Sequence, residues 1–320
     1  MSLKDQSTLA SNQAHALTPQ ASLLPGDVLL MLGDGPLSAL IAWCGDSVYS
    51  HAALVADNGE LIEAAASGVR RYPIAQRLQD DKNFGFIDGF HTLAHDGQAL
   101  DAADRAAIVA HAQSLIGTPY PLDSLATLGV IVAIRGKLPQ HRLARLLVRE
   151  ALDHLVRNNP SHMVCSELVF RALAECDVQP LGRLAPTIVI TPPTHLPFPE
   201  IDWVALLEEV GPLLWPKSKL KLALAAATPV DAAAGVVDEA AVAPGEDLAD
   251  EALMQHVAQA RAVLGLQPAP PSLATDAVGA KMAAAGPADD PRPNPKLVTP
   301  QDLAATPDHV ALGRLMQAAS

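Results

Sequence analysis

The chain has 320 residues, of which 49% are hydrophobic and only 3% aromatic, and its formal net charge is −13 from 22 basic and 35 acidic side chains. This length allows one well-buried core with further chain beyond it, and the negative charge argues against nucleic acid as a partner. Three irregularly spaced cysteines, Cys44, Cys165 and Cys176, exclude a disulfide framework and a zinc cluster.

The beginning of the chain is polar and lacks the cationic and apolar regions of a secretory signal. The longest apolar runs, 129–134 and 222–227, are too short to span a bilayer. A cytoplasmic protein is therefore expected, and a protein exported by a signal-independent secretion system would have the same appearance.

Short apolar runs bounded by turn residues predict strands in the first third of the chain, at 28–32, 50–56, 60–65, 68–74 and 84–90. The turn Asp57-Asn58-Gly59 joins the second and third of these runs into a hairpin. Pro73 favours an edge position for the fourth run.

Helical periodicity and capping residues predict helices at 37–44, 101–116, 122–157 with a break near Gly136 and Pro139, and 163–173. We expect a loose leader at 1–22 and a compact domain at 23–216. An Ala/Pro-rich insertion or partly disordered excursion follows at 217–295, with an amphipathic helix at 246–264. The final segment, 296–320, has a capped helical pattern that can pack back on the core.

One set of side chains suggests catalysis. Cys165 lies where a helix is predicted to begin, and a helix N-terminus favours the thiolate and offers N–H groups to an oxyanion. His51 begins one strand of the predicted hairpin and Glu63 lies on the other, so a carboxylate can sit beside an imidazole. Taken singly, a cysteine early in an apolar helix and a histidine in a strand are more often structural.

Five short segments occur in an order that resembles the permuted branch of the NlpC-type papain-fold hydrolases, the YiiX-like proteins. They are Leu24-Pro25-Gly26-Asp27, Ser50-His51-Ala52-Ala53, Leu61-Ile62-Glu63-Ala64, Gly117-Thr118-Pro119-Tyr120 and Val164-Cys165-Ser166-Glu167. The resemblance covers about residues 23–195. It implies an α+β fold of the circularly permuted papain-like type, in which a small antiparallel sheet packs against the helix that bears the nucleophile.

The resemblance also implies Cys165 as nucleophile, His51 as base and Glu63 as the third, least certain member. Ser166, Tyr120 and Asp27 are candidate substrate or oxyanion contacts, although Asp27 also suits a turn. The segment 297–303 is similar to a Thr-Pro-x-x-Leu stretch that closes some YiiX-like domains, and 187–196 is a rival match.

Three functions follow as hypotheses. The first is a thiol hydrolase that cleaves an amide, a peptide or isopeptide bond such as those of cell-wall stem peptides. The second is a lipid esterase or acyltransferase with the same Cys–His site, as in lecithin–retinol acyltransferase-like enzymes. The third is an inactive scaffold that binds a protein partner through the C-terminal region.

The expected partner of the enzyme is a peptide or lipid substrate, and the chemistry needs no cofactor. A basic stretch runs through Arg135, Lys137, His141, Arg142, Arg145 and Arg149. It is usually a solvated face, and the alternative is peripheral contact with acidic headgroups or an acidic partner.

Overall fold

The computed structural model describes residues 16–65, 67–118, 123–158, 164–189, 196–214, 248–266 and 293–319. Within them the fold is α+β, built on one antiparallel sheet of six strands in the order β4-β3-β2-β1-β5-β6. The strands are β1 (Val28–Gly33), β2 (His51–Val55), β3 (Glu60–Ala65), β4 (Gly68–Pro73), β5 (Phe84–Thr92) and β6 (His309–Gln317).

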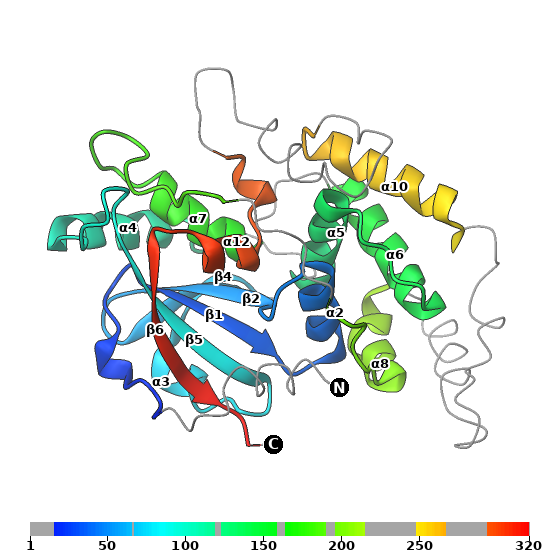
Figure 1. Cartoon of the computed structure of the whole chain (residues 1–320), viewed down its shortest axis with the longest axis horizontal. Coiled ribbons are helices and arrows are strands. Elements are labelled where there is room, and N and C mark those ends of the chain that lie inside the picture. Colours follow the sequence, from blue (N-terminus) through cyan, green and yellow to red (C-terminus); the bar gives the residue numbers. More distant parts are fainter. Residues whose placement is uncertain are drawn as a thin grey trace.

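The helices of the described residues are α2 (Pro36–Cys44), α3 (Ile74–Arg77), α4 (Ala102–Ser114), α5 (Asp123–Arg135), α6 (Arg142–Asn158), α7 (Cys165–Ala174), α8 (Trp203–Leu214), α10 (Asp250–Val263) and α12 (Pro300–Ala305). Two 3-10 turns, η1 (Gln20–Ser22) and η4 (Pro295–Leu297), complete them. In Figure 1, α4, α7 and α12 lie along the sheet, and α2, α5, α6, α8 and α10 gather beside it.

Local sequence signals account for most of these elements. The predicted hairpin is present as β2 and β3, with Asn58 and Gly59 at positive φ in its turn. The strand that ends at Pro73 lies at the sheet edge, as predicted. Asp101 caps α4, because its carboxylate accepts a hydrogen bond from the backbone N–H of Asp104 at 2.8 Å.

The two faces of the sheet bury different sets of side chains. Ala52, Leu54 and Ile62 belong to a large core cluster that includes Leu168 and Val169 of α7. Alternate residues of β1, β2 and β3 point to the other face and pack into a second, smaller cluster. They are Leu29, Met31, Ala53, Val55 and Leu61. The sheet is thus covered by α7 on one face, and the first turn of α7 lies near β2.

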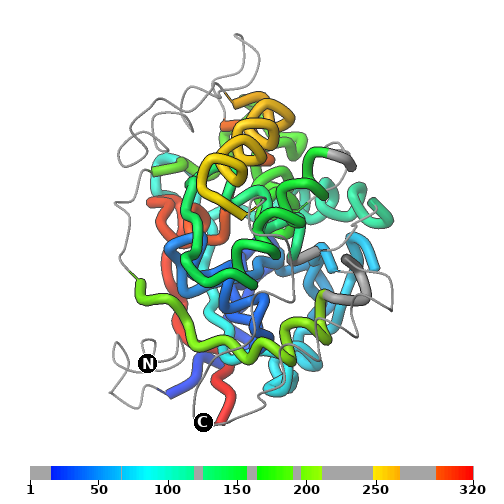
Figure 2. The backbone as a smooth tube through the Cα atoms, turned by 90° about the vertical axis from the view of Figure 1, so that its right-hand side faces the viewer, coloured from blue at the N-terminus to red at the C-terminus, as the bar shows by residue number. Residues whose placement is uncertain are grey.

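The second helical group is held together by close contact between α5 and α6. A Cβ atom at Gly129 of α5 would lie 2.6 Å from the backbone oxygen of Ala151 in α6, so only glycine fits this crossing. Figure 2 shows α10 lying over the α5–α6 pair. Arg145 of α6 anchors it by donating to the backbone oxygen of Leu248 and to the Asp250 carboxylate.

Replacement of Gly129 by alanine is expected to destabilise the protein by about 1–3 kcal/mol, because the new methyl group collides with α6 backbone. Urea unfolding measures the change. The control is Ala126→Ser at a half-buried position of the same helix, which should stay within about 1 kcal/mol. Equal stability of Gly129→Ala and wild type would contradict the close crossing.

The C-terminal segment differs from the prediction. Its capped helix is present but ends at Ala305, with Thr299 and Asp302 capping it reciprocally. The predicted continuation of this helix is wrong for residues 309–317, which form β6 and pair with residues 86–92 of β5. The backbone of β5 offers hydrogen-bond partners to residues 309–317, and this partner strand, distant in sequence, cannot be predicted from the local sequence pattern.

Other segments that were predicted to be loose contain ordered parts. The N-terminal leader contacts β6, because the backbone N–H of Thr18 donates to the oxygen of Arg314 at 2.7 Å. The excursion at 217–295 contains α10, which agrees with the amphipathic helix predicted at 246–264 and packs on α5 and α6. Residues 1–15, 215–247 and 267–292 lie outside the described residues. Among those that are described, no helix has the length and apolar character needed to cross a membrane.

Candidate active site

His51 and Glu63 meet at the beginning of the β2–β3 hairpin. Ala53 of β2 lies directly opposite Glu63 of β3. His51, two residues before Ala53, is therefore the diagonal neighbour of Glu63 on the same face of the sheet. The Nε2 atom of His51 lies 3.3 Å from Oε2 of Glu63. The predicted pairing of imidazole and carboxylate is therefore present, across a diagonal rather than directly opposite positions.

The Glu63 carboxylate is buried and surrounded by cationic groups. Its Oε1 atom accepts hydrogen bonds from Arg77 at 2.6 Å and from Nε and Nη2 of Arg70 at 3.1 and 2.9 Å. Burial acts to raise the pKa of Glu63, but the hydrogen bond and charge of His51, with help from Arg77 and Arg70, lower it to about 2. Glu63 therefore stays ionised at neutral pH.

Cys165 is the first residue of α7, and its sulfur interacts with His51. Although burial lowers the pKa of His51, the charge of the Cys165 thiolate and its hydrogen bond, followed by Glu63, raise that pKa to about 10. His51 is the first residue of β2, Cys165 is the first residue of α7, and α7 packs against β2, so the imidazole and the sulfur meet at the beginning of the strand.

The first turn of α7 presents unpaired backbone donors next to the thiol. The first backbone bond of the helix runs from the N–H of Leu168 to the oxygen of Val164. The N–H groups of Cys165 and Ser166 thus have no partner within the helix, and they point toward its N-terminal end. Such donors suit an anionic sulfur or a developing oxyanion.

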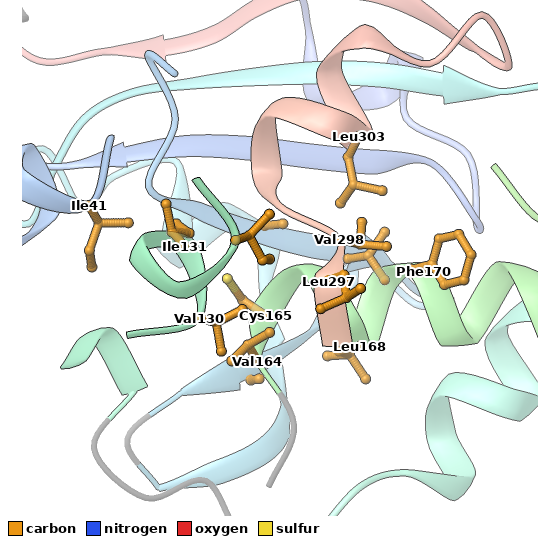
Figure 3. Close-up of a cluster of buried hydrophobic side chains, with 14 of the residues drawn as sticks. Ile41, Val130, Ile131, Val164, Cys165, Leu168, Phe170, Leu297, Val298 and Leu303 are labelled. Carbon is orange, nitrogen blue, oxygen red and sulfur yellow. The ribbon is translucent and has the colours of Figure 1, made fainter. Parts of the chain in front are cut away.

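The thiol itself is buried, with only 2% of Cys165 exposed. Figure 3 shows its sulfur directed among apolar side chains from α5 and from the segment before α12, including Val130, Ile131, Leu297 and Val298. The Ser166 hydroxyl donates to the backbone oxygen of Val298 at 2.7 Å, so it holds this covering segment instead of facing an oxyanion. Side chains of these elements must move before a carbonyl carbon can reach the sulfur.

Replacement of Ser166 by alanine is expected to cost about 1–3 kcal/mol of stability, because the buried oxygen of Val298 loses its partner. Urea unfolding is the measurement. The control is Ser114→Ala, which removes a hydroxyl–backbone hydrogen bond at an exposed helix end and should cost about 0.5 kcal/mol or less. Equal losses of unfolding free energy in the two variants would show that the buried Ser166 hydrogen bond stabilises the protein no more than an exposed one.

Two other candidate contacts do not join this cluster. Asp27 lies four residues before Met31, the β1 partner of His51, and therefore at the other end of β1. Its buried carboxylate binds the Leu24 N–H, His91 and Arg105 at 2.8, 2.7 and 3.1 Å, which fits the role of a turn residue. Tyr120 lies outside the described residues.

The remaining cysteines lie in the core, where the effect of burial on the thiol pKa outweighs that of the nearby cations Lys137 and Arg183. Burial raises the pKa of Cys44 to about 12 and that of Cys176 to about 11. In the described ranges, no three His, Cys, Asp or Glu side chains come together to hold a metal ion. Several members of the basic stretch are engaged internally: Arg135 and Lys137 pair with Asp46, and Arg145 pairs with Asp250.

Sequence reasoning missed the two arginines around Glu63. The position of Arg70 could have been predicted, because the short connection between β3 and β4 places Arg70 directly opposite Glu63 in the strand register. Arg77 had none, because it reaches Glu63 from α3, a four-residue helix with no recognisable pattern.

Comparison with known proteins adds a weak structural neighbour. No family model and no curated protein matches the chain. Among solved structures, the crystal structure described as the metalloprotein yiiX from Escherichia coli O157:H7 is similar with a TM-score of 0.31 and 17% sequence identity, over 50% of this chain and 67% of that one. The chain therefore has a distant, YiiX-like structural neighbour, and the chemistry of its site follows from its own residues.

Proposed function

We propose that the protein is a cysteine hydrolase that cleaves an amide bond through an acyl-enzyme on Cys165, with His51 as the base. The observation that supports this most is the imidazole that interacts with both the Cys165 sulfur and the Glu63 carboxylate. The order of histidine strand before cysteine helix also fits a circularly permuted papain-like fold of the NlpC type, which we propose as the finer fold assignment.

The reaction starts from the thiolate–imidazolium pair, formed by transfer of the thiol proton to the imidazole and favoured by the raised pKa of His51. Glu63 accepts a hydrogen bond from Nε2–H, so Nδ1 is the nitrogen left to take that proton. The thiolate attacks the carbonyl carbon, and the N–H groups at the start of α7 stabilise the oxyanion. Collapse breaks the C–N bond, His51 returns its proton to the departing amine, and a thioester remains.

Hydrolysis of the thioester reverses these roles. His51 removes a proton from water, hydroxide adds to the thioester carbon, and the C–S bond breaks to release a carboxylic acid. The sulfur leaves as a thiolate beside the protonated imidazole, which restores the starting pair. Glu63 keeps its charge throughout and stabilises the imidazolium.

A lipid ester is the second candidate substrate, and one observation favours it. The side chains around the sulfur are apolar: Val130 and Ile131 from α5, and Leu297 and Val298 from the covering segment (Figure 3). A fatty acyl group on Cys165 would bury its chain among them, which favours such a thioester by the hydrophobic effect. The bond that breaks is then C–O, and the alcohol takes the proton.

The test is to incubate the purified protein with peptidoglycan fragments and, separately, with phospholipid vesicles, alongside Cys165→Ala. New amino groups identify the amidase and free fatty acids the lipase, and mass spectrometry should detect an acyl group on Cys165 in either case. Cys44→Ala, which removes another buried thiol, is the matched control and should retain activity. Product formation that persists in Cys165→Ala, or no product and no acyl-enzyme from either substrate, would reject the proposal and favour the scaffold.

A further inference from the structure

The two oxygens of the Glu63 carboxylate have separate partners. Oε2 faces Nε2 of His51, whereas Oε1 accepts hydrogen bonds only from Arg70 and Arg77 among the described side chains. A carboxylate can rotate about its terminal bond, and this torsion is broad and weakly restricted by itself. The direction of Oε2 is therefore set by whatever holds Oε1.

Arg77 is the better anchored of the two arginines. Its side chain is only 7% exposed, against 41% for Arg70. The guanidinium carbon lies 4.5 Å from the ring centre of Tyr72 and 4.6 Å from that of Phe84. A second contact, from Nη1 to the Asp80 carboxylate at 3.2 Å, holds its other side.

These contacts leave the Arg77 guanidinium little freedom. It lies between two aromatic rings, which favour a planar cation by stacking and by cation–π attraction. Its Nη2–H donates a charge-assisted hydrogen bond to Oε1 at 2.6 Å, shorter than either bond from Arg70. Arg70 reaches the same oxygen from the edge strand β4 and also lies over the ring of Tyr72, at 4.9 Å, but its side chain is far more exposed than that of Arg77 and its hydrogen bonds to Oε1 are longer.

We propose that Arg77 is a positioning residue of the active site, which acts through Glu63 to fix the ring of His51. By holding Oε1, Arg77 keeps Oε2 in place to accept from Nε2–H. That hydrogen bond fixes the tautomer with the proton on Nε2 and leaves Nδ1 toward the sulfur. The role in catalysis rests on the proposed function, whereas the effect on the His51 hydrogen bond does not.

The test compares Arg77→Met with wild type by proton NMR of the histidine ring. In wild type, the Nε2–H proton of His51 should give a low-field signal, identified by its loss in His51→Ala. Arg77→Met should lose or shift this signal, and kcat should fall roughly 10- to 100-fold, part of the 10²–10⁴-fold that a positioned base contributes. Arg77→Lys, which keeps the positive charge, should recover part of both.

Arg71→Met is the matched control. Arg71 lies on β4 next to Arg70 and, like Arg77, is ion-paired, here with Asp57 and Glu60, but it does not contact Glu63. This variant should keep the low-field signal and the activity, and Arg70→Met should lose less than Arg77→Met.

An unchanged signal in folded Arg77→Met, or an equal or larger loss in Arg70→Met, would overturn the proposal. If Arg77→Met does not fold, the neutral variant Arg77→Gln takes its place and is read in the same way. A signal that responds as expected in a protein without hydrolytic activity would reject the proposed function and leave the positioning role intact.

Discussion

Cys165→Ala is expected to lower kcat by at least roughly 10⁴-fold on whichever substrate the wild type hydrolyses, because the proposed acyl-enzyme forms on the sulfur that this change removes. His51→Ala should lower kcat by roughly 10²–10⁴-fold, since the thiol then lacks its proton acceptor. Steady-state kinetics with both variants and with wild type measure these losses.

The double variant sharpens this prediction. If the two residues act as a unit, Cys165→Ala/His51→Ala should be no slower than Cys165→Ala alone, because a base without a nucleophile has nothing to activate. Cys176→Ala is the control, as its thiol donates to the backbone oxygen of Leu173 within the core. If the fold-loss in kcat of the double variant equals the product of the two single losses, His51 acts on a group other than Cys165.

Glu63→Ala is expected to destabilise the protein by about 3–5 kcal/mol, because it leaves the buried Arg77 guanidinium without its shortest partner. The matched control is Glu60→Ala on the same strand. Glu60 is one-third exposed and pairs with Arg71, so its removal should cost about 1 kcal/mol or less. Urea unfolding at neutral pH compares the two variants.

The contribution of Glu63 should also depend on pH. Its pKa is lowered from 4.5 to about 2 in the folded protein, so the folded state binds its proton less readily than the unfolded chain. This difference corresponds to about 3 kcal/mol, present above pH 4.5 and lost as the pH falls toward 2. Unfolding of Glu63→Gln should lack this part of the pH dependence. A wild type and a Glu63→Gln variant with parallel curves between pH 4.5 and 2 would contradict the ion-paired state of Glu63.

Much of the fold could be predicted because its signals are local. The β2–β3 hairpin follows from alternating apolar residues around a turn in which Asn58 and Gly59 adopt positive φ. The start of α4 follows from the Asp101 cap, and the break between α5 and α6 follows from Gly136 and Pro139. The pairing of His51 with Glu63 could be predicted from the hairpin and its register alone, because the two residues are only 12 positions apart in the sequence.

Propensities, caps and turns act between close neighbours along the chain, so most elements and the pairing of His51 with Glu63 could be predicted from the sequence. Features made by segments far apart in the chain could not, because they exist only once the chain has folded. The strand β6 forms because β5 offers a free edge, Asp27 is bound by His91 and Arg105, and Arg77 reaches Glu63 from α3. The apolar cover over Cys165 is of the same kind, because α5 and residues 297–298 meet there only once the core has formed around them.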